Sequence, residues 1–181
     1  MRRLGAAGLA LLPLAASSPA QAAYGTGACE MAMMHAALHF DVSEPIMRAV
    51  GLTEAGTAEG RIHPWAANID GRAVYYPDQE SAARGVEAAL RDGAHNVDVG
   101  CLQISMAWHG QAFGSIAEAF TPEVNVAYGA ALLVALKREK GTWPLAIQFY
   151  HSSDPERQRA YLCQVLAHYA PANYRRACGG S

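Results

Sequence analysis

The first 22 residues, MRRLGAAGLALLPLAASSPAQA, constrain the rest of the chain more than any other segment. Two arginines precede an apolar run from Leu4 to Ala16, and the segment ends in the small-residue sequence AQA. This order of basic, apolar and A-x-A segments is typical of a secretory signal peptide, and the run is too short for a lasting membrane anchor. We therefore expect residues 1–22 to be removed and residues 23–181 to fold after export.

Export bounds both the number of domains and the state of the cysteines. Of the 181 residues, 159 remain after Ala22, and a chain of this length folds as one domain with a sizeable core. The four cysteines are Cys29, Cys101, Cys163 and Cys178. An even number in an oxidising compartment indicates two disulfides, and the residues alone leave all three connectivities open.

The charge balance argues against a polyanionic partner. The chain has 16 acidic and 14 basic residues, and loss of Arg2 and Arg3 with the signal peptide lowers the basic count to 12, for a net charge near −4. We therefore expect neither nucleic acid nor an anionic membrane as the main partner. No later stretch is apolar enough to cross a bilayer, so we expect no stable membrane insertion.

Metal binding has little support in the sequence. No two cysteines have the close spacing of a zinc site. His35 and His39 lie one helical turn apart, but no H-E-x-x-H glutamate or third ligand accompanies them. Two surface histidines on a helix are the better interpretation. We expect no metal and no cofactor.

Capping residues and apolar periodicity predict about six helices. The predicted helices run from Cys29 to Phe40, from Ser43 to about Glu54, from Asp78 to Gly93, from Thr121 to Gly141, from Thr142 past Tyr150, and from Asp154 to about Tyr169. The buried face predicted for the Asp78 helix comprises Ala82, Ala83, Val86, Ala89 and Leu90. One β signal interrupts the helices, because Ala66–Ile69 and Arg72–Tyr76 flank an Asp-Gly turn and predict a hairpin. The fold class is therefore mainly α, a single domain with a small β-hairpin.

Glu54 is the most informative ionisable residue. It lies four positions after Val50 and seven after Met47, so it continues the buried stripe of its helix. A carboxyl at that place is partly desolvated, and desolvation raises its pKa, which suits a general acid. On the pattern alone, a helix-end glutamate that turns to solvent remains an equally good interpretation.

Other polar residues support weaker hypotheses. Cys101 would need a base such as His109 or His151 to act as a nucleophile, and a disulfide is favoured over a free thiolate in an exported chain. Gln103 and Tyr150 lie in otherwise apolar segments, where each either satisfies a buried backbone group or lines a cleft. Trp65, Trp108 and Trp143 are expected mostly in the core, with Trp65 beside the hairpin as an alternative sugar-stacking face.

Four blocks in this order resemble the lytic transglycosylases of the soluble lytic murein transglycosylase type, which have a lysozyme-like fold. The blocks are IMRAVGLTEAG, VDVGCLQIS, TPEVNVAYGAALLVAL and WPLAIQFYHS, and together they extend over most of the mature chain. The resemblance assigns the catalytic glutamate to Glu54, the cleft glutamine to Gln103 and the tyrosine near the catalytic region to Tyr150. Leu102 stands where the family has methionine before the glutamine.

The sequence looks closest to a subset of these domains from Gram-negative bacteria. That subset shares a PW…N…G pattern after the catalytic helix, matched here by Pro64, Trp65, Asn68 and Gly71, and a cysteine in the glutamine motif. The resemblance adds Trp65, Asn68 and Leu102 to the expected substrate-binding residues. Two departures matter: Ala55 replaces the serine that usually follows the glutamate, and His151 replaces the asparagine after the tyrosine, so the roles of those residues do not carry over.

The resemblance implies a periplasmic enzyme that cleaves the MurNAc-GlcNAc β-1,4 bond of peptidoglycan and forms a 1,6-anhydro ring, with Glu54 as acid and then base. Two alternatives stay open. A lysozyme-type muramidase would use a second carboxylate, for which Asp70 and Asp98 are candidates. A non-catalytic peptidoglycan-binding module of a secretion or flagellar apparatus would bind glycan strands without turnover. In either case glycan strands are the partner.

The glutamine motif also bears on the cysteines. If Gln103 faces the cleft, Cys101 faces the other way, and we expect it to pair with Cys29 and to tie the cleft motif to the first helix. This pairing leaves Cys163 and Cys178 for the second disulfide.

Overall fold

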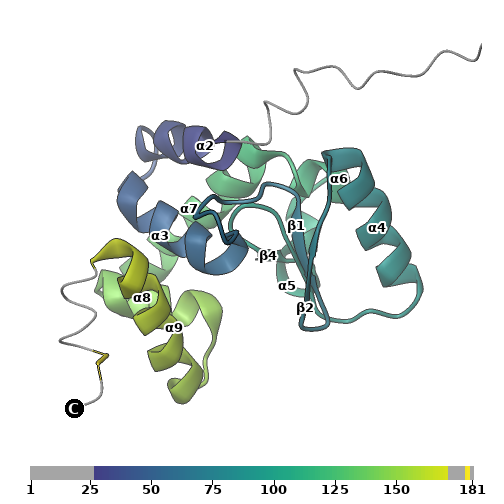
Figure 1. The fold of residues 1–181 in the computed structure, drawn as a ribbon. Helices are drawn as coiled ribbons and strands as arrows, with labels where there is room; N and C mark the ends of the chain where they lie inside the picture. Colours follow the sequence, from purple (N-terminus) through teal and green to yellow (C-terminus); the bar gives the residue numbers. More distant parts are fainter. Residues whose placement is uncertain (1–26, 171–177, 180–181) are drawn as a thin grey trace, which may run out of the picture.

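Eight α-helices and a four-stranded antiparallel sheet make up the part of the chain that the computed structural model describes, residues 27–170 and 178–179 (Figure 1). The predicted signal peptide, residues 1–22, lies outside this part. With the labels of Figure 1, the helices are α2 (Ala28–Ala37), α3 (Glu44–Ala55), α4 (Gln79–Arg91), α5 (Met106–His109), α6 (Ile116–Ala119), α7 (Pro122–Lys140), α8 (Trp143–His151) and α9 (Pro155–Tyr169). None of them is both long and apolar enough to span a membrane.

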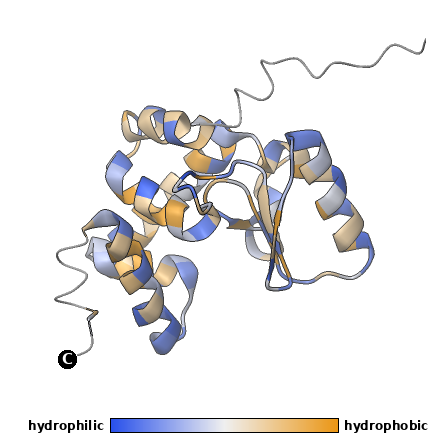
Figure 2. Cartoon of the chain, in the orientation of Figure 1, coloured by the Kyte–Doolittle hydropathy of each residue, from blue (hydrophilic) through white to orange (hydrophobic). Residues whose placement is uncertain are grey.

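Five of the helices form one lobe around the larger hydrophobic core. Helix α7 packs against α2 and α8, and α9 packs against α3 and α8. Hydrophobic residues are concentrated where these helices meet (Figure 2). The apolar stripe predicted for α3 is confirmed, because Ile46, Met47 and Val50 are all buried in this core. The stripe fixes the rotation of α3, and with it the direction in which its last turn presents Glu54.

The sheet forms a second lobe. Its strands are β1 (Ala66–Ile69), β2 (Arg72–Tyr75), β3 (Val97–Val99) and β4 (Ile104–Ser105), in the spatial order β2-β1-β3-β4. The hairpin around Asp-Gly is confirmed, with Ile69 opposite Arg72 at the turn. The sheet is larger than the sequence predicted, because β3 pairs with the other side of β1 and β4 pairs with β3. Helices α4 and α6 pack on this lobe and enclose a smaller core.

Most predicted helix boundaries are confirmed, and two details differ. The first helix ends at Ala37 instead of Phe40, and turns complete the segment. In α4 the buried residues are Ala82, Ala83 and Val86, whereas Leu90 is 37% exposed. The prediction for Leu90 was wrong because the buried face of α4 continues from Val86 to Ala89, which packs against the smaller core, and Leu90 lies one position round the helix from that face. Asp78 caps α4 as predicted, and its side chain accepts a hydrogen bond from the Ser81 N–H.

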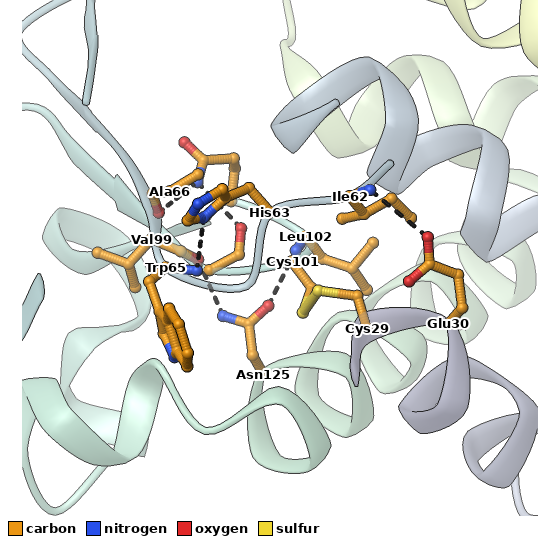
Figure 3. The surroundings of a disulfide bond; sticks show 12 residues. Cys29, Glu30, Ile62, His63, Trp65, Ala66, Val99, Cys101, Leu102 and Asn125 are labelled. Carbon is orange, nitrogen blue, oxygen red and sulfur yellow. Dashed lines mark hydrogen bonds between the residues drawn. A yellow bond between two sulfur atoms is a disulfide. The ribbon is translucent and has the colours of Figure 1, made fainter. Parts of the chain in front are cut away.

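Both disulfides form with the expected partners, Cys29 with Cys101 and Cys163 with Cys178. The first joins α2 to the loop between β3 and β4, as Figure 3 shows. Cys101 is therefore a structural residue and has no free thiol to act as a nucleophile. Two disulfides indicate that the chain folds in an oxidising, extracytoplasmic environment.

Candidate active site

A polar cleft of about 460 Å³ lies between the two lobes. The helical lobe contributes Glu54, Leu132, Tyr150, His151 and Arg157, and the sheet lobe contributes the remaining wall. A cleft of this volume is within the range of sites that hold a small molecule or part of a polymer. Three residues that the sequence singled out as functional, Glu54, Gln103 and Tyr150, line this same cleft although they come from three different segments.

Glu54 projects into the cleft from the last turn of α3, and its side chain is only 15% exposed. Removal from water disfavours the charged carboxylate and raises the pKa of Glu54 to about 7. A hydrogen bond from Tyr161 opposes this rise, and the negative charge of Asp98 adds to it. Near neutral pH the carboxyl is thus divided between its protonated and ionised forms, which is the condition a group needs to give and take a proton.

Tyr161 on α9 is the residue that holds the Glu54 carboxyl. Its hydroxyl donates a hydrogen bond to Glu54 Oε1 at 2.6 Å, and the tyrosine itself is 2% exposed. This contact was missed in the sequence analysis. A signal for it exists, since Gln158, Tyr161 and Val165 recur on one buried face of α9, and a buried tyrosine hydroxyl requires a partner.

His151 covers this pair from the cleft side. Its ring stacks on the Tyr161 ring, with centroids 4.4 Å apart and planes 3° from parallel. Its Nδ1 atom lies 4.0 Å from Glu54 Oε1. Burial, aided by the charge of Arg157, lowers the pKa of His151, so the imidazole is neutral at pH 7. His151 therefore packs beside Glu54 as a neutral ring.

Gln103 faces the cleft from an unusual backbone conformation, with φ of 44°. Its Nε2 donates to the carbonyl oxygens of Ala66 and Gly100, both at 3.0 Å. Two carbonyl acceptors require the amide nitrogen at that position, which leaves Oε1 as the atom that can accept a hydrogen bond from a ligand. The side chain is thus fixed by the sheet lobe while one acceptor remains for the cleft.

Asn125 on α7 clamps the loop that carries Gln103 (Figure 3). It is fully buried, and its Nδ2 donates to the Val99 carbonyl at 2.9 Å while its Oδ1 accepts from the Leu102 N–H at 2.9 Å. Gly100 permits this approach, because a Cβ there would lie 2.4 Å from Asn125 Nδ2 and the glycine has φ of 81°. The buried asparagine thus satisfies three backbone groups, the third being the Ala119 carbonyl, and ties the loop to α7.

Tyr150 lies in the cleft but contacts the loop instead of Glu54. Its hydroxyl donates to the Leu102 carbonyl at 2.8 Å. The close packing of α7 on this loop needs Gly129, since a Cβ there would lie 2.5 Å from Leu102 Cδ1 and 3.2 Å from the Tyr150 hydroxyl. The role of Tyr150 is therefore to hold the glutamine loop against α8, whereas Tyr161 holds the carboxyl.

Asn68 and Asp98 belong to the sheet wall of the cleft. They are directly opposite each other on β1 and β3, and both line the cleft. Asn68 Oδ1 is buried and has no hydrogen-bond donor among the described residues. Burial raises the pKa of Asp98, and a hydrogen bond with Ser105 lowers it in part. Asp70, the other carboxylate considered in the sequence, is an exposed turn residue that accepts from the N–H groups of His95 and Asn96.

Two residues that we expected to contact sugar do not line the cleft. Trp65 is 8% exposed and belongs to the smaller core, and Leu102 is fully buried in the larger one. Both support the cleft walls from behind, because large apolar side chains gain more from the core than from a polar cleft. The prediction for Trp108 was wrong in the opposite direction. We expected it in the core, whereas it is 85% exposed and lines the cleft.

Comparison with known proteins adds no assignment. No family model matches the chain, and the searches of curated proteins and of solved structures returned no match. Within residues 27–170 and 178–179, His, Cys, Asp and Glu side chains form no group of three that could hold a metal ion. The chemistry of the cleft is therefore argued from its own residues, a carboxyl with a pKa of about 7 beside an array of hydrogen-bonding groups.

Proposed function

We propose that this protein is a peptidoglycan lytic transglycosylase that acts in the periplasm. The observation that carries the proposal is Glu54, a mostly buried carboxyl with a pKa of about 7 that faces an open polar cleft and is held by Tyr161. The four sequence blocks that resemble this family meet at that cleft or directly behind it. The substrate is the MurNAc-GlcNAc β-1,4 bond of glycan strands, and the export signal with two disulfides supports an envelope location.

In the proposed reaction, protonated Glu54 donates its proton to the bridging oxygen as the bond from that oxygen to C1 of the MurNAc ring breaks. The acetamido group of the same sugar stabilises the positive charge at C1. Ionised Glu54 then removes the proton from the C6 hydroxyl, whose oxygen attacks C1 and closes the 1,6-anhydro ring. Glu54 is thereby protonated again, and no water is consumed.

The other cleft residues orient the sugar in this scheme. Gln103 Oε1 accepts a hydrogen bond from a sugar N–H or O–H group, and its side chain is held by its bonds to the Ala66 and Gly100 carbonyls. Asn68 lines the path of the sugar. Tyr161 keeps the carboxyl in one rotamer, so that one oxygen is aimed at the substrate. The neutral His151 ring limits the access of water to Glu54 from its side of the cleft.

Hydrolysis of the same bond is the second candidate function, and the position of Asp98 favours it. It is a second carboxylate in the same cleft, as a lysozyme-type mechanism requires. Asp98, however, shares a hydrogen bond with Ser105 on the neighbouring strand, and the four sequence blocks resemble a family that uses a single glutamate. These two observations favour the mechanism with one carboxylate.

Digestion of purified sacculi, followed by mass spectrometry of the soluble products, tests the proposal. We expect muropeptides that end in 1,6-anhydro-MurNAc, and no release of these products by the Glu54→Gln variant. Products heavier by one water would identify a hydrolase. Binding to sacculi without turnover by the unmodified protein would identify a non-catalytic module.

A further inference from the structure

Trp108 is the most exposed large hydrophobic side chain in the described part of the chain, at 85%, and it lines the cleft. A tryptophan that stays in water forgoes the burial of about 150–250 Å² of surface, the area that large aromatic side chains usually bury. Neither the proposed chemistry nor the fold uses this residue. Its position at the rim of the candidate active site therefore requires an explanation.

The exposure of Trp108 follows from how its short helix is anchored. Met106 and His109 are three positions apart in α5 and share one face of the helix. Met106 packs against both hydrophobic cores, and His109 Nδ1 lies 2.9 Å from the Tyr128 hydroxyl. With these two side chains fixed inward, Ala107 and Trp108 face outward. The indole is thus held at the cleft by two anchored neighbours.

The sheet places a row of residues beside Trp108, and three of the four carry polar side chains. Four residues are paired across the strands and all line the cleft, in the order Ala73, Asn68, Asp98 and Ser105. The row ends at β4, and α5 with Trp108 begins at the next residue. Four strands are about 14 Å wide, which is longer than a single pyranose ring. A ligand that follows this row is an oligomer.

A second exposed aromatic residue lies at the other edge of the sheet. Tyr75 is on β2, is 50% exposed and lines the same cleft. It lies two residues from Ala73 on the same face of its strand. The row of residues across the sheet is therefore flanked by an aromatic ring on each side. Aromatic faces carry partial negative charge and attract the C–H face of a sugar ring, whereas polar side chains bond its edges.

We propose that Trp108 is the stacking platform of a distal sugar-binding subsite, so that the cleft selects glycan chains that cross the sheet from Tyr75 to Trp108. The inference rests on the proposed function for the identity of the ligand as a glycan. It adds a specificity for chain length, because a short fragment bound at Glu54 does not reach both aromatic residues.

A protein–protein interface explains the exposure of Trp108 less well. Interfaces use contiguous apolar patches, whereas the cleft beside Trp108 is lined by polar groups such as Ser105, Asp98 and His109. Exposed apolar side chains do gather elsewhere, with Met31 and Met34 on one face of α2 and Leu38 at its C-cap. These residues lie outside the cleft and provide a control position.

The test is isothermal titration calorimetry on Glu54→Gln protein, which prevents turnover, with chitohexaose and chitobiose as probes. Adding Trp108→Ala should weaken hexasaccharide binding about tenfold, the size of a well-formed aromatic contact. The disaccharide should be affected less than about twofold. Trp108→Phe should retain most of the affinity because a flat ring remains, and Leu38→Ala should change nothing.

Unchanged hexasaccharide affinity in the Trp108→Ala protein would overturn the platform, as would an equal loss for both probes. The proposed function fails separately. If the unmodified protein releases no anhydro products but binds hexasaccharide through Trp108, the transglycosylase assignment is refuted and the subsite stands. Release of anhydro products by the unmodified protein, together with failure of the Glu54→Gln protein to bind chitohexaose, would refute the subsite and leave the transglycosylase assignment intact.

Discussion

The two walls of the cleft are built in different ways. The helical wall presents Glu54 with Tyr161 and His151 packed around it, and Tyr161 is almost completely buried. The sheet wall presents paired polar groups on short strands, with Trp108 and Tyr75 exposed at its edges. A reactive acid needs desolvation and a fixed rotamer, which helix packing supplies. Recognition of a sugar chain needs exposed hydrogen-bonding edges and aromatic faces, which a row across a sheet supplies.

The two walls should differ most when one carboxyl is removed from each. Glu54→Gln should lower turnover of sacculi about a thousandfold or more, because the proton donor is lost. Asp98→Asn should keep turnover within about tenfold and leave the products unchanged. Initial rates and product masses check both variants. An equal loss in Asp98→Asn would contradict the assignment of the chemistry to the helical wall alone.

The Cys29–Cys101 disulfide connects the two walls, and its removal tests their dependence on each other. It closes a loop with a sequence separation of 72, so Cys29→Ser with Cys101→Ser should lower the free energy of unfolding by about 4 kcal/mol. Denaturant titration measures this loss. Loss of Cys163–Cys178, with a separation of 15, should lower it by about 3 kcal/mol.

The second disulfide is also the functional control. Its loss should leave the affinity for glycan unchanged, because Cys163 lies outside the cleft lining, whereas loss of the first disulfide frees the loop that carries Gln103. Equal effects of the two removals on glycan affinity would show that the first disulfide does not fix the cleft.

Burial of Glu54 should destabilise the fold at alkaline pH. Its pKa is about 7 in the folded chain against an ordinary value of 4.5, so the folded state binds more protons between these two pH values. Stability therefore falls as pH rises from about 4.5 to about 7. At pH 8, Glu54→Gln should be more stable than the unmodified protein by about 3 kcal/mol, and by much less at pH 4. Thermal unfolding at both pH values measures this difference, and an advantage that does not depend on pH would contradict it.

The two cleft tyrosines should have different effects on the pH profile. Tyr161→Phe removes a hydrogen bond that stabilises the ionised form of Glu54, so the pKa of Glu54 rises and the alkaline limb of the rate profile moves to higher pH. Turnover should fall about tenfold as the carboxyl loses its fixed rotamer. Tyr150→Phe should weaken substrate binding without this shift, because its hydroxyl bonds Leu102. If the pH–rate profiles of the Tyr161→Phe protein and the unmodified protein coincide, Tyr161 does not influence the ionisation of Glu54.

Local signals were sufficient for most of the helices and for the hairpin. Asp78 and the Asp-Gly turn act through neighbours in sequence, and the structure confirms the elements that they predict. Glu54 was also identified from its place on the stripe of α3. The strands β3 and β4 escaped prediction because they are three and two residues long and are defined by pairing with β1, which is distant in sequence.

The remaining parts of the site depend on contacts that no periodicity contains. Tyr161 reaches Glu54 across 107 positions of sequence, and Trp108 is exposed because its neighbours in α5 are anchored to other elements. Trp65 illustrates the converse, since its place beside the hairpin suggested a sugar contact and packing buried it in the smaller core. Residue type and spacing therefore predicted a partly desolvated carboxyl at Glu54, whereas tertiary packing decided which aromatic residues face the cleft.

The most direct test of the central claim, that the helical wall converts Glu54 into a general acid at neutral pH, is to titrate its carboxyl. The carboxyl carbon can be followed by ¹³C NMR across the pH range, with Glu54→Gln protein to identify the resonance. The account predicts an apparent pKa of about 7. A titration near the ordinary glutamate value of about 4.3 would contradict it.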